Sequence, residues 1–412
     1  MPPAASTAAA CNAQAAWQRL APQRWPVPPD AFPPGTALVG GAVRDALLDR
    51  LGPTPDLDLV VPGDAVALSR QLRRHHGGSA VVLDAERSIA RLVVQGWSID
   101  LARQEGDSLE ADLHRRDYTI NAMALPLADP QALVDPLGGA AHLATGDLVA
   151  IAEANLLDDP LRLLRGIRLA SELDFQLEPR TRAWIHQHHD QLTRVAGERV
   201  LAELEKLAAA PGGQRGLAEV LRSQLLRPWR EDHSHDQDLL ESLSPEQAQR
   251  LGLSAEETTS ALALARLAAV LDGPALQSLR SSRRLQQRVE RLRHWQTRLG
   301  CADPATAAAG LTEQERLQLH RQLEADLPAL LLGWPDQQAG PWLQRWRHDG
   351  DRLFHPRPAI DGGSLQRELQ LKPSPQLGAL LDHLMLEQAF GRLQEGDDVL
   401  QRARQWLAAD NP

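Results

Sequence analysis

Two aspartates one residue apart interrupt a short apolar run, residues 55–61, and this segment limits the fold of the chain more than any other. In a β-strand alternate side chains leave the same face about 6.6 Å apart, so the carboxylates of Asp56 and Asp58 are expected on one face. Such a pair can share two metal ions about 4 Å apart, the arrangement used for in-line phosphoryl transfer, and Mg²⁺ prefers oxygen ligands. An isolated Asp-x-Asp pair is more often a solvated surface feature, so its meaning depends on its neighbours.

A glycine pair lies upstream of these aspartates, between a strand-like run and a helical run. Residues 37–39 predict a strand, and residues 42–48 predict the start of a helix. Gly40 and Gly41 at such a turn let backbone N–H groups approach a triphosphate, and a helix N-terminus favours the bound anion. Arg44, one turn into the helix, is placed to reach the phosphates. A tight turn with a surface arginine is the simpler interpretation.

The first third of the chain alternates between strand and helix patterns, and the rest is helical. Further strands are expected at residues 56–61, 80–83, 90–94 and 97–101, with a hairpin turn at Gln95-Gly96 and a helix over 64–75. From about residue 150 the helical spacing of Leu and Ala dominates, interrupted by Gly and Pro. The pattern predicts an α+β head followed by an all-α remainder.

Composition excludes several classes of protein. With 43% apolar residues in 412, the chain can bury real cores, but it has no apolar run of about 18 residues that could cross a membrane. Residues 1–34 are rich in Ala and Pro and predict a disordered leader. The two cysteines, Cys11 and Cys301, fit a reducing cytoplasm, since a cysteine in such a leader is a poor disulfide partner. A net charge of −10 argues against non-specific coating of nucleic acid but permits a local basic patch.

Other polar residues of the head add to the aspartate pair. Asp100, in the strand 97–101, is a candidate third carboxylate or general base, although an edge-strand surface residue would look the same. Asp117 and Asn121 would share a face if residues 112–124 formed a helix. With Arg116 they suit the hydroxyls of a sugar and the phosphates above it, and the alternative is helix capping with a routine salt bridge.

Taken in order, these motifs resemble the class II tRNA nucleotidyltransferases and bacterial poly(A) polymerases. The resemblance rests on Gly40-Gly41-x-x-Arg44-Asp45, Asp56-x-Asp58 and Arg115-Arg116-Asp117-x-x-x-Asn121-Ala122. Residues 135–139, 157–168 and 198–206 are similar to the family's turn between head and neck, its nucleotide-base motif and the motif that closes the neck.

The resemblance implies a polymerase-β-like nucleotidyltransferase head with a mixed sheet, followed by an all-α neck, body and tail. The expected divisions are a leader 1–34, a catalytic head 35–140, a neck 141–210, a body 211–330 and a tRNA-binding tail 331–412. Its activity would be the addition of C or A residues from CTP or ATP to a tRNA 3′ end with two Mg²⁺ ions. The implied roles are metal binding by Asp56 and Asp58 with Asp100 nearby, triphosphate binding by Gly40, Gly41 and Arg44, and ribose binding by Arg116, Asp117 and Asn121.

The base motif has its own logic. Arg donates and Asp accepts hydrogen bonds, so Asp159 and Arg162, on one side of a helix, can together imitate the pairing edge of a base, with Arg165 one turn on in support. Arg168 and Arg199 are candidate contacts to the RNA backbone. The oligomeric state is left open.

The sequence departs from the family pattern at two places. The base motif usually opens with Glu-Asp, whereas this chain has Asp158-Asp159. Between Asp100 and Arg115, members that add the whole CCA usually carry a flexible loop of twenty or more residues, and here the segment is short. It is similar to members that add only the two C residues, although other members are compatible with it. A poly(A) polymerase, a non-catalytic tRNA-binding protein and a small-molecule nucleotidyltransferase remain as alternatives.

Overall fold

The computed structural model describes residues 5–230, 236–300, 303–393 and 398–409. The chain forms two compact units: Met1–Val195 with Ser223–Leu225, and Ala196–Arg222 with Leu226–Pro412. The first unit contains the sheets, and every element described in the second unit is a helix. None of the described helices is long and apolar enough to cross a membrane.

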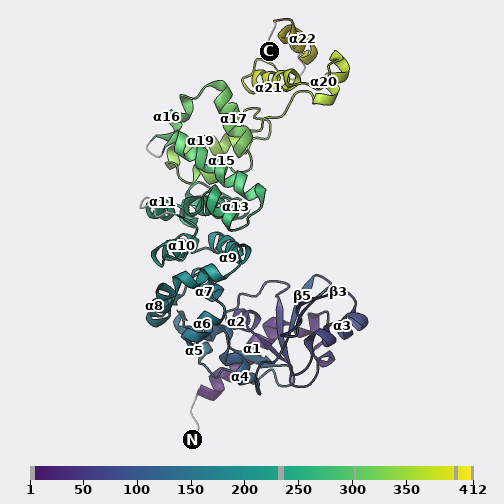
Figure 1. Ribbon diagram of the computed structural model, residues 1–412, viewed down its shortest axis with the longest axis vertical. Coiled ribbons are helices and arrows are strands. Elements are labelled where there is room, and N and C mark those ends of the chain that lie inside the picture. The colour runs from purple at the N-terminus through teal and green to yellow at the C-terminus, as the bar shows by residue number, and fades with distance from the viewer. Residues whose placement is uncertain (1–4, 231–235, 301–302, 394–397, 410–412) are drawn as a thin grey trace. The chain divides into compact units, whose positions relative to one another are not determined.

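The first unit is built on a six-stranded mixed sheet, in the order β3-β4-β5-β2-β1-β6 (Figure 1). Only β2 and β5 pair in parallel, and the other neighbours are antiparallel. The strands are β1 Ala37–Val39, β2 Leu57–Val61, β3 Ser79–Asp84, β4 Ile89–Val94, β5 Trp97–Arg103 and β6 Ala124–Pro126. The mixed sheet and the α+β class predicted for the head are confirmed.

The register of the sheet separates its two faces. Arg91 pairs with Asp100, Asp100 with Asp58, and Asp58 with Val39, so these side chains form one row on one face. Directly opposite residues of neighbouring strands point to the same side of a sheet. The intervening row on the other face contains Leu92, Ile99 and Leu57, all fully buried.

Each face is covered by a different helix. Helix α3, Ala65–His76, packs on β3, β4 and β5, and its Leu72 is buried. On the carboxylate face, Leu113 of α4, Leu109–His114, joins a buried cluster with Val39, Val60 and Ala124. Burial of Leu113 therefore anchors α4 on this face, and the residues that follow α4 emerge beside Asp58.

Local sequence accounts for most of these elements. Gln95 and Gly96 both have positive φ, 50° and 80°, as the tight turn between β4 and β5 requires. The predicted strands and the helix over 64–75 are confirmed, with boundaries shifted by a few residues. One shift matters, because Asp56 lies just before β2 and is exposed, whereas Asp58 lies inside the strand and is half-buried.

The prediction that residues 1–34 form a disordered leader is wrong for the described part of that segment. Helix α1, Ala5–Leu20, packs on α2, Gly41–Leu47, and Ala13 and Ala16 are fully buried. Two short 3₁₀ turns follow, Pro22–Arg24 and Pro29–Ala31. Alanine is the best helix former, so an Ala-rich segment becomes ordered once neighbouring apolar surface covers one side of it.

The chain leaves the sheet through short elements that complete the first unit. They are the 3₁₀ helix Thr119–Asn121, α5 Gly139–Thr145, β7 Asp147–Leu148, α6 Glu153–Asp158, α7 Leu161–Leu173, β8 Gln176–Leu177, α8 Pro179–Gln187 and the 3₁₀ helix His189–Arg194. The hydroxyl of buried Tyr118 donates to the carbonyl of Arg162, 2.7 Å away. A Cβ on Gly166 would lie 2.0 Å from that hydroxyl, so only glycine lets α7 pack this closely.

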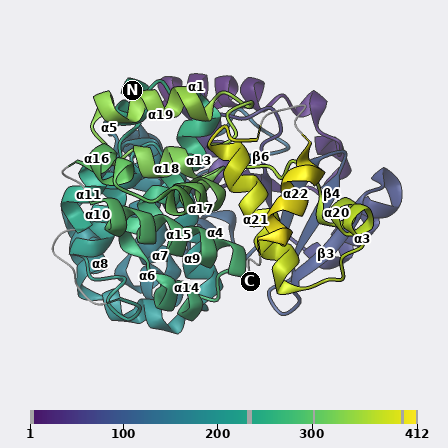
Figure 2. The ribbon, with the colours of Figure 1, turned by 90° about the horizontal axis from the view of Figure 1, so that it is seen from above.

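The second unit is a succession of helices. They are α9 Gly197–Ala209, α10 Gly213–Arg222, α11 Asp236–Ser242, α12 Pro245–Arg250, α13 Ala255–Val270, α14 Gly273–Ser278, α15 Arg283–Leu299, α16 Pro304–Ala309, α17 Glu313–Leu323, α18 Leu327–Leu331, α19 Asp336–Trp346, α20 Gly362–Leu369, α21 Pro375–Ala389 and α22 Val399–Ala408. Helices α20, α21 and α22 pack against one another (Figure 2). Leu365, Leu380 and Ala403 belong to the buried cluster between them. The expected divisions at 140, 210 and 330 stay predictions; residues 196–210, expected in the neck, belong to this second unit.

Candidate active site

The carboxylates of Asp58 and Asp100 are neighbours across β2 and β5. Asp100 does not stand free: its two oxygens accept from Arg91, Nε at 2.7 Å and Nη2 at 2.8 Å. Burial, then the negative charge of Asp100, raises the pKa of Asp58 to about 6, while Arg116 and Arg165 act in the opposite direction and Asp56 adds to the rise. The negative charge around Asp58 is therefore incompletely balanced by the neighbouring arginines.

The glycine turn lies directly against this carboxylate. Gly40 has φ 74° and ψ −136°, a conformation that residues with a Cβ rarely adopt. A Cβ there would lie 3.3 Å from Oδ2 of Asp58 and 3.4 Å from Nη1 of Arg116. Gly41 is the first residue of α2. The turn thus brings backbone, a carboxylate and a guanidinium together at the start of a helix.

Arg44 is largely buried, and its guanidinium lies beside the glycine turn. It is 9% exposed, and its Nε and Nη2 donate to the carboxylate of Asp45 at 2.8 and 2.9 Å. Its Nη1 donates to Oδ1 of Asn121 at 2.8 Å. Contact of Arg44 with the phosphates stays a prediction: each nitrogen of its guanidinium already has a protein partner, but its Nη2 lies 3.7 Å from the position that a Cβ on Gly41 would take.

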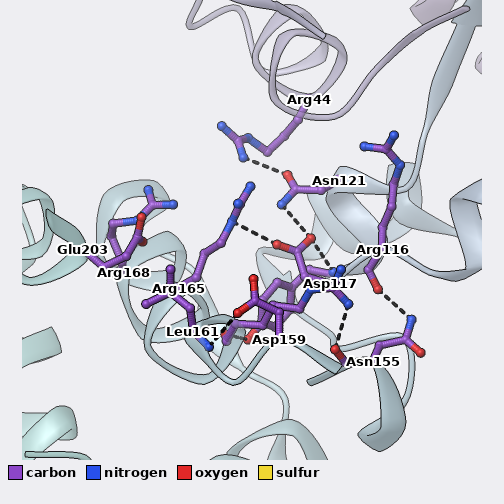
Figure 3. A network of polar contacts seen from close by, with 12 residues as sticks. Arg44, Arg116, Asp117, Asn121, Asn155, Asp159, Leu161, Arg165, Arg168 and Glu203 are labelled. Atoms are coloured by element: carbon purple, nitrogen blue, oxygen red, sulfur yellow. Dashed lines mark hydrogen bonds and ion pairs between the residues drawn. The ribbon is translucent and has the colours of Figure 1, made fainter. Parts of the chain in front are cut away.

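A continuous set of polar contacts runs from Arg44 to α7 (Figure 3). Asn121 donates from Nδ2 to Oδ1 of Asp117 at 3.1 Å, and Oδ2 of Asp117 pairs with Nε of Arg165 at 2.9 Å. Burial opposes ionisation of Asp117, but Arg165 and the hydrogen bonds from Asn121 and the Tyr118 N–H lower its pKa below the usual range. Asp117 is thus a buried, charged junction. Its contact with Asn121 was predicted for an α-helix but arises in the 3₁₀ turn Thr119–Asn121.

Arg116 is the cation best placed beside Asp58. Its Nη2 donates to Oδ2 of Asp112 at 3.2 Å, and its Nη1 lies near the position a Cβ on Gly40 would take. Its Nε is buried and has no hydrogen-bond partner among the described residues. A buried donor without a partner is costly, so an unsatisfied guanidinium edge at this point suits an anionic ligand.

The base motif differs from the expected single helix. Asp159 lies between α6 and α7 in an extended conformation, φ −134° and ψ 97°, and its carbonyl accepts from the Arg162 N–H. The guanidinium of Arg162 donates to the carbonyls of Asn155, at 2.7 Å, and Arg115, at 3.1 Å. Arg165, by contrast, is exposed on α7 and faces Asp117. Asp159 and Arg162 are therefore adjacent through the backbone and not as two side chains on one helical face.

Asn155 was missed by the sequence analysis. Its Nδ2 donates at 2.7 Å to the carbonyls of both His114 and Arg116, and its own carbonyl accepts from Arg162 (Figure 3). It thus ties the segment that carries Arg116 to α6. No spacing rule identifies such a residue, although an Asn inside a helical run is a weak signal. The sequence analysis also missed Tyr118, which gave a stronger signal because it is the single tyrosine of the chain.

The two arginines expected to contact RNA differ in exposure. Arg168 is 8% exposed, and its Nη1 lies 2.5 Å from Oε2 of Glu172. Its contact with RNA stays a prediction, and its side chain is largely buried. Arg199, on α9, is exposed.

The donor set is compatible with divalent cations. Among the described residues no three His, Cys, Asp or Glu side chains converge as a preformed metal cage. Mg²⁺ commonly binds through one or two carboxylates and completes its shell with water and substrate phosphates. Asp58 and Asp100, both half-buried, and exposed Asp56 supply hard oxygen atoms. The raised pKa of Asp58 marks a place where a cation would relieve repulsion.

Comparisons with known proteins cover nearly the whole chain. A family model described as the poly A polymerase head domain matches residues 36–149, and one described as the probable RNA and SrmB-binding site of polymerase A matches 174–235. A CC-adding tRNA nucleotidyltransferase of Synechocystis sp. is 34% identical, covering 94% of this chain and 97% of that protein. An A-adding tRNA nucleotidyltransferase of Deinococcus radiodurans is 42% identical over 47% of this chain and 44% of that protein.

Solved structures share the fold. The Bacillus stearothermophilus CCA-adding enzyme in complex with CTP has a TM-score of 0.67 at 20% identity, covering 91% of this chain and 93% of that one. The Thermotoga maritima CCA-adding enzyme complexed with tRNA has a TM-score of 0.62 at 21% identity, covering 90% of this chain and 91% of that one.

Proposed function

The chain belongs to the family of tRNA nucleotidyltransferases and poly(A) polymerases, and we propose that it adds C residues from CTP to the 3′ end of tRNA. The 3′-hydroxyl of the tRNA attacks the α-phosphate of the nucleotide. A bond forms between that oxygen and phosphorus, and the bond to pyrophosphate breaks. No nucleic-acid template takes part, since the protein itself reads the base.

The observation that carries this proposal is the unbroken set of contacts from the glycine turn to α7. Arg44, Asn121, Asp117 and Arg165 link the expected triphosphate, ribose and base regions in one network beside Asp58. Such a network fixes the relative positions of its side chains before the substrate arrives, and positioning supplies much of the catalysis in phosphoryl transfer.

The carboxylates are the proposed metal ligands. Two Mg²⁺ ions, held by Asp56 and Asp58 with Asp100 nearby, would activate the attacking hydroxyl and neutralise charge on the triphosphate. The protein contributes the position of these oxygens, because β2 and β5 fix Asp58 beside Asp100. Asp100 acts as a third ligand or as a base toward the hydroxyl.

The remaining roles follow from the contacts of each side chain. Gly40 and Gly41 leave room for the triphosphate, and the unsatisfied edge of Arg116 supplies positive charge to it. Arg44, beside Gly41, is the second cation proposed for the triphosphate, and it also holds Asn121 in place. Asp117 and Asn121 contact the ribose, and Asp159 and Arg162 with Arg165 contact the base, for which Arg162 has to give up part of its present bonding.

The short connection after β5 favours CC addition. Strand β5 ends at Arg103 and α4 begins at Leu109, so five residues join them. A long flexible segment, the feature associated with the switch from C to A, has no room here. The Synechocystis relative, a CC-adding enzyme by name, supports the same choice. A tRNA substrate and only two cysteines also fit a cytoplasmic location.

The test uses purified protein, Mg²⁺ and three tRNAs that end before CCA, after C and after CC. CTP and ATP are supplied separately and together, and products are read at single-nucleotide resolution. We expect growth by C up to the CC end and then arrest, even when ATP is present.

Other outcomes separate the alternatives. Addition of A to the CC-ended tRNA would remove the CC-only proposal and leave a CCA- or A-adding enzyme. Long A tracts on an unstructured control RNA would indicate a poly(A) polymerase. No addition to any substrate would contradict the proposed reaction as a whole.

A further inference from the structure

We propose that Arg91 is a positioning residue that clamps Asp100 and competes with divalent cations for the carboxylates of Asp56, Asp58 and Asp100. The proposal rests on the proposed function, which assigns cations to these carboxylates. It concerns a residue outside every motif that identified the family, in the middle of β4.

The contact has the geometry of a two-point clamp. Arg91 and Asp100 face each other in the antiparallel ladder of β4 and β5. Nε and Nη2 of Arg91 lie 2.7 and 2.8 Å from the two oxygens of Asp100. A planar guanidinium matches a carboxylate in this way, and the pair is stronger and more directional than a single contact. The orientation of Asp100 is therefore set by the sheet and by Arg91 in the absence of a cation.

The same row contains the next carboxylate. Asp58 faces Asp100 on the other side, in the parallel ladder of β2 and β5. Asp100 thus lies between a permanent cation, Arg91, and the carboxylate of Asp58. A cation that uses Asp100 together with Asp58 has to share the oxygens of Asp100 with Arg91 or displace it, and the positive charge of Arg91 opposes its approach.

Exposure allows the clamp to open. The side chain of Arg91 is 46% exposed and that of Asp100 is 27% exposed, so the guanidinium can move into water when a cation takes its place. An arginine locked in the core could not exchange in this way. The pair therefore keeps the carboxylates from repelling one another without a cation and yields when one binds.

The experiment measures cation binding to the full-length protein without nucleotide or tRNA. Mn²⁺ and Mg²⁺ are titrated by calorimetry, and thermal unfolding is followed with and without the ion. The variants are Arg91→Met, which removes charge and clamp, and Arg91→Lys, which keeps the charge. Arg87→Met is the matched control, since Arg87 forms an exposed pair with Glu105 outside the row.

We expect Arg91→Met to bind Mn²⁺ about three- to tenfold more tightly than wild type, as loss of one nearby unit charge suggests. Its melting temperature without metal should fall, and the rise on adding metal should exceed that of wild type. Arg91→Lys should stay within about twofold of wild type in affinity, because charge sets the competition. Arg87→Met should match wild type in both measurements.

Two results would overturn the proposal: Arg91→Met with wild-type affinity and wild-type metal-induced stabilisation, or Arg91→Met with weaker binding, which would mean that Arg91 assists the cation. If Arg91→Met does not fold, Arg91→Gln takes its place in the comparison. Failure of the proposed function is a different result. In that case wild type binds no divalent cation, or Asp58→Asn binds it as well as wild type does, and the inference on Arg91 falls with it.

Discussion

Asp58 is the residue at which the opposing charges of the site meet. Burial and the carboxylate of Asp100 raise its pKa to about 6, and the guanidinium groups of Arg116 and Arg165 limit the rise. An ionised carboxylate in this position costs free energy, because burial removes part of its hydration. A carboxylate with a raised pKa among other charged groups is typical of a binding or catalytic site.

We therefore expect Asp58→Asn to abolish nucleotide transfer, with a loss of about 1,000-fold or more, because a neutral amide cannot hold the proposed cations. Stability and tRNA affinity should change little, since the substitution removes a charge that the folded state disfavours. Single-turnover incorporation of CTP, melting and tRNA titration measure these three quantities. Asp107→Asn, at an exposed position in the β5–α4 connection, is the control. Full transfer by Asp58→Asn would exclude Asp58 as a ligand.

Asp159 supports a second prediction at this scale. Its extended conformation between α6 and α7 leaves it beside the backbone of Arg162. We expect Asp159→Ala to reduce discrimination between CTP and ATP by about tenfold or more, as loss of one hydrogen-bonding group in a base-reading site does. Competition between the two nucleotides on a tRNA that lacks CCA measures the ratio. An unchanged ratio would mean that Asp159 does not contact the base.

The sequence predicted which polar side chains lie near one another better than it predicted how they are held. Asp58 lies opposite Asp100 in the sheet, and Asp117 contacts Asn121, because strand alternation and short spacings are visible in a sequence. The contact of Arg44 with Asn121 and that of Arg162 with the carbonyl of Arg115 were not predictable, since the partner in each is distant in the sequence. Long side chains have many conformations, and tertiary contacts select one of them.

At the scale of elements, one buried arginine organises the junction of several helices in the second unit. Arg266 of α13 is fully buried and donates to the carbonyls of Ala208, Ala210 and Leu243 at 2.8 to 2.9 Å. The first two lie at the C-terminal end of α9, where carbonyls lack helical partners. Burial lowers the pKa of Arg266 to about 10, so it remains charged at neutral pH.

We expect Arg266→Leu to lower the free energy of unfolding by about 3 kcal/mol or more, because several buried carbonyls lose their donor. Urea unfolding monitored by tryptophan fluorescence measures it. Arg280→Leu is the control, since Arg280 pairs with Glu198 at an exposed site and should matter by less than about 1 kcal/mol. Equal losses in the two variants would contradict the structural role of Arg266.

His320 of α17 predicts an acid sensitivity of the same unit. It is 2% exposed, its ring centroid lies 3.9 Å from that of Phe354, and its Nδ1 has no partner among the described residues. Burial, assisted by Arg345, lowers its pKa to about 3. Below the ordinary histidine pKa of about 6.5 the unfolded chain binds a proton that the folded chain does not, so stability falls as pH falls from about 6.5 to 3.

The contribution of His320 should reach about 1.4 kcal/mol per pH unit within that window. His320→Phe, which keeps an aromatic ring but cannot be protonated, should be less sensitive to acid. Urea unfolding at pH 7 and pH 5 measures the difference, with His294→Gln, at an exposed histidine, as the control. A wild-type pH dependence in His320→Phe would assign the acid sensitivity to other groups.

Helices and strands were predicted well where a local turn signal or a local apolar pattern specifies them. They were predicted poorly where their formation depends on burial against a distant segment. The β4–β5 hairpin follows from Gln95-Gly96 alone, and β2 follows from its apolar alternation. That α1 is an ordered helix could not be predicted in this way, because nothing in an Ala-rich run shows that α2 will cover Ala13 and Ala16.

At the scale of the whole molecule, the protein and its proposed substrate, tRNA, both carry net negative charge. A chain of net charge −10 repels RNA on average, so tRNA must be held at local groups of arginine. Binding of this kind releases counterions from the phosphates, and its affinity falls linearly with salt on a logarithmic plot. CTP binding, which involves one small ligand, should depend on salt less steeply.

Arg199, exposed on α9 within the region matched by the RNA-binding family model, provides the test. We expect Arg199→Gln to weaken tRNA binding at low salt and to reduce the slope of log affinity against log salt by about 0.7 to 0.9, the value for one lost phosphate contact. Arg70→Gln is the matched control, because Arg70 is exposed on α3, which covers the face of the sheet away from the carboxylates. Fluorescence anisotropy between low and physiological salt gives both slopes. Equal slopes for wild type and Arg199→Gln would remove Arg199 from the RNA contact, whereas a reduced slope for Arg70→Gln as well would show that tRNA responds to the overall charge of the protein and not to a defined surface.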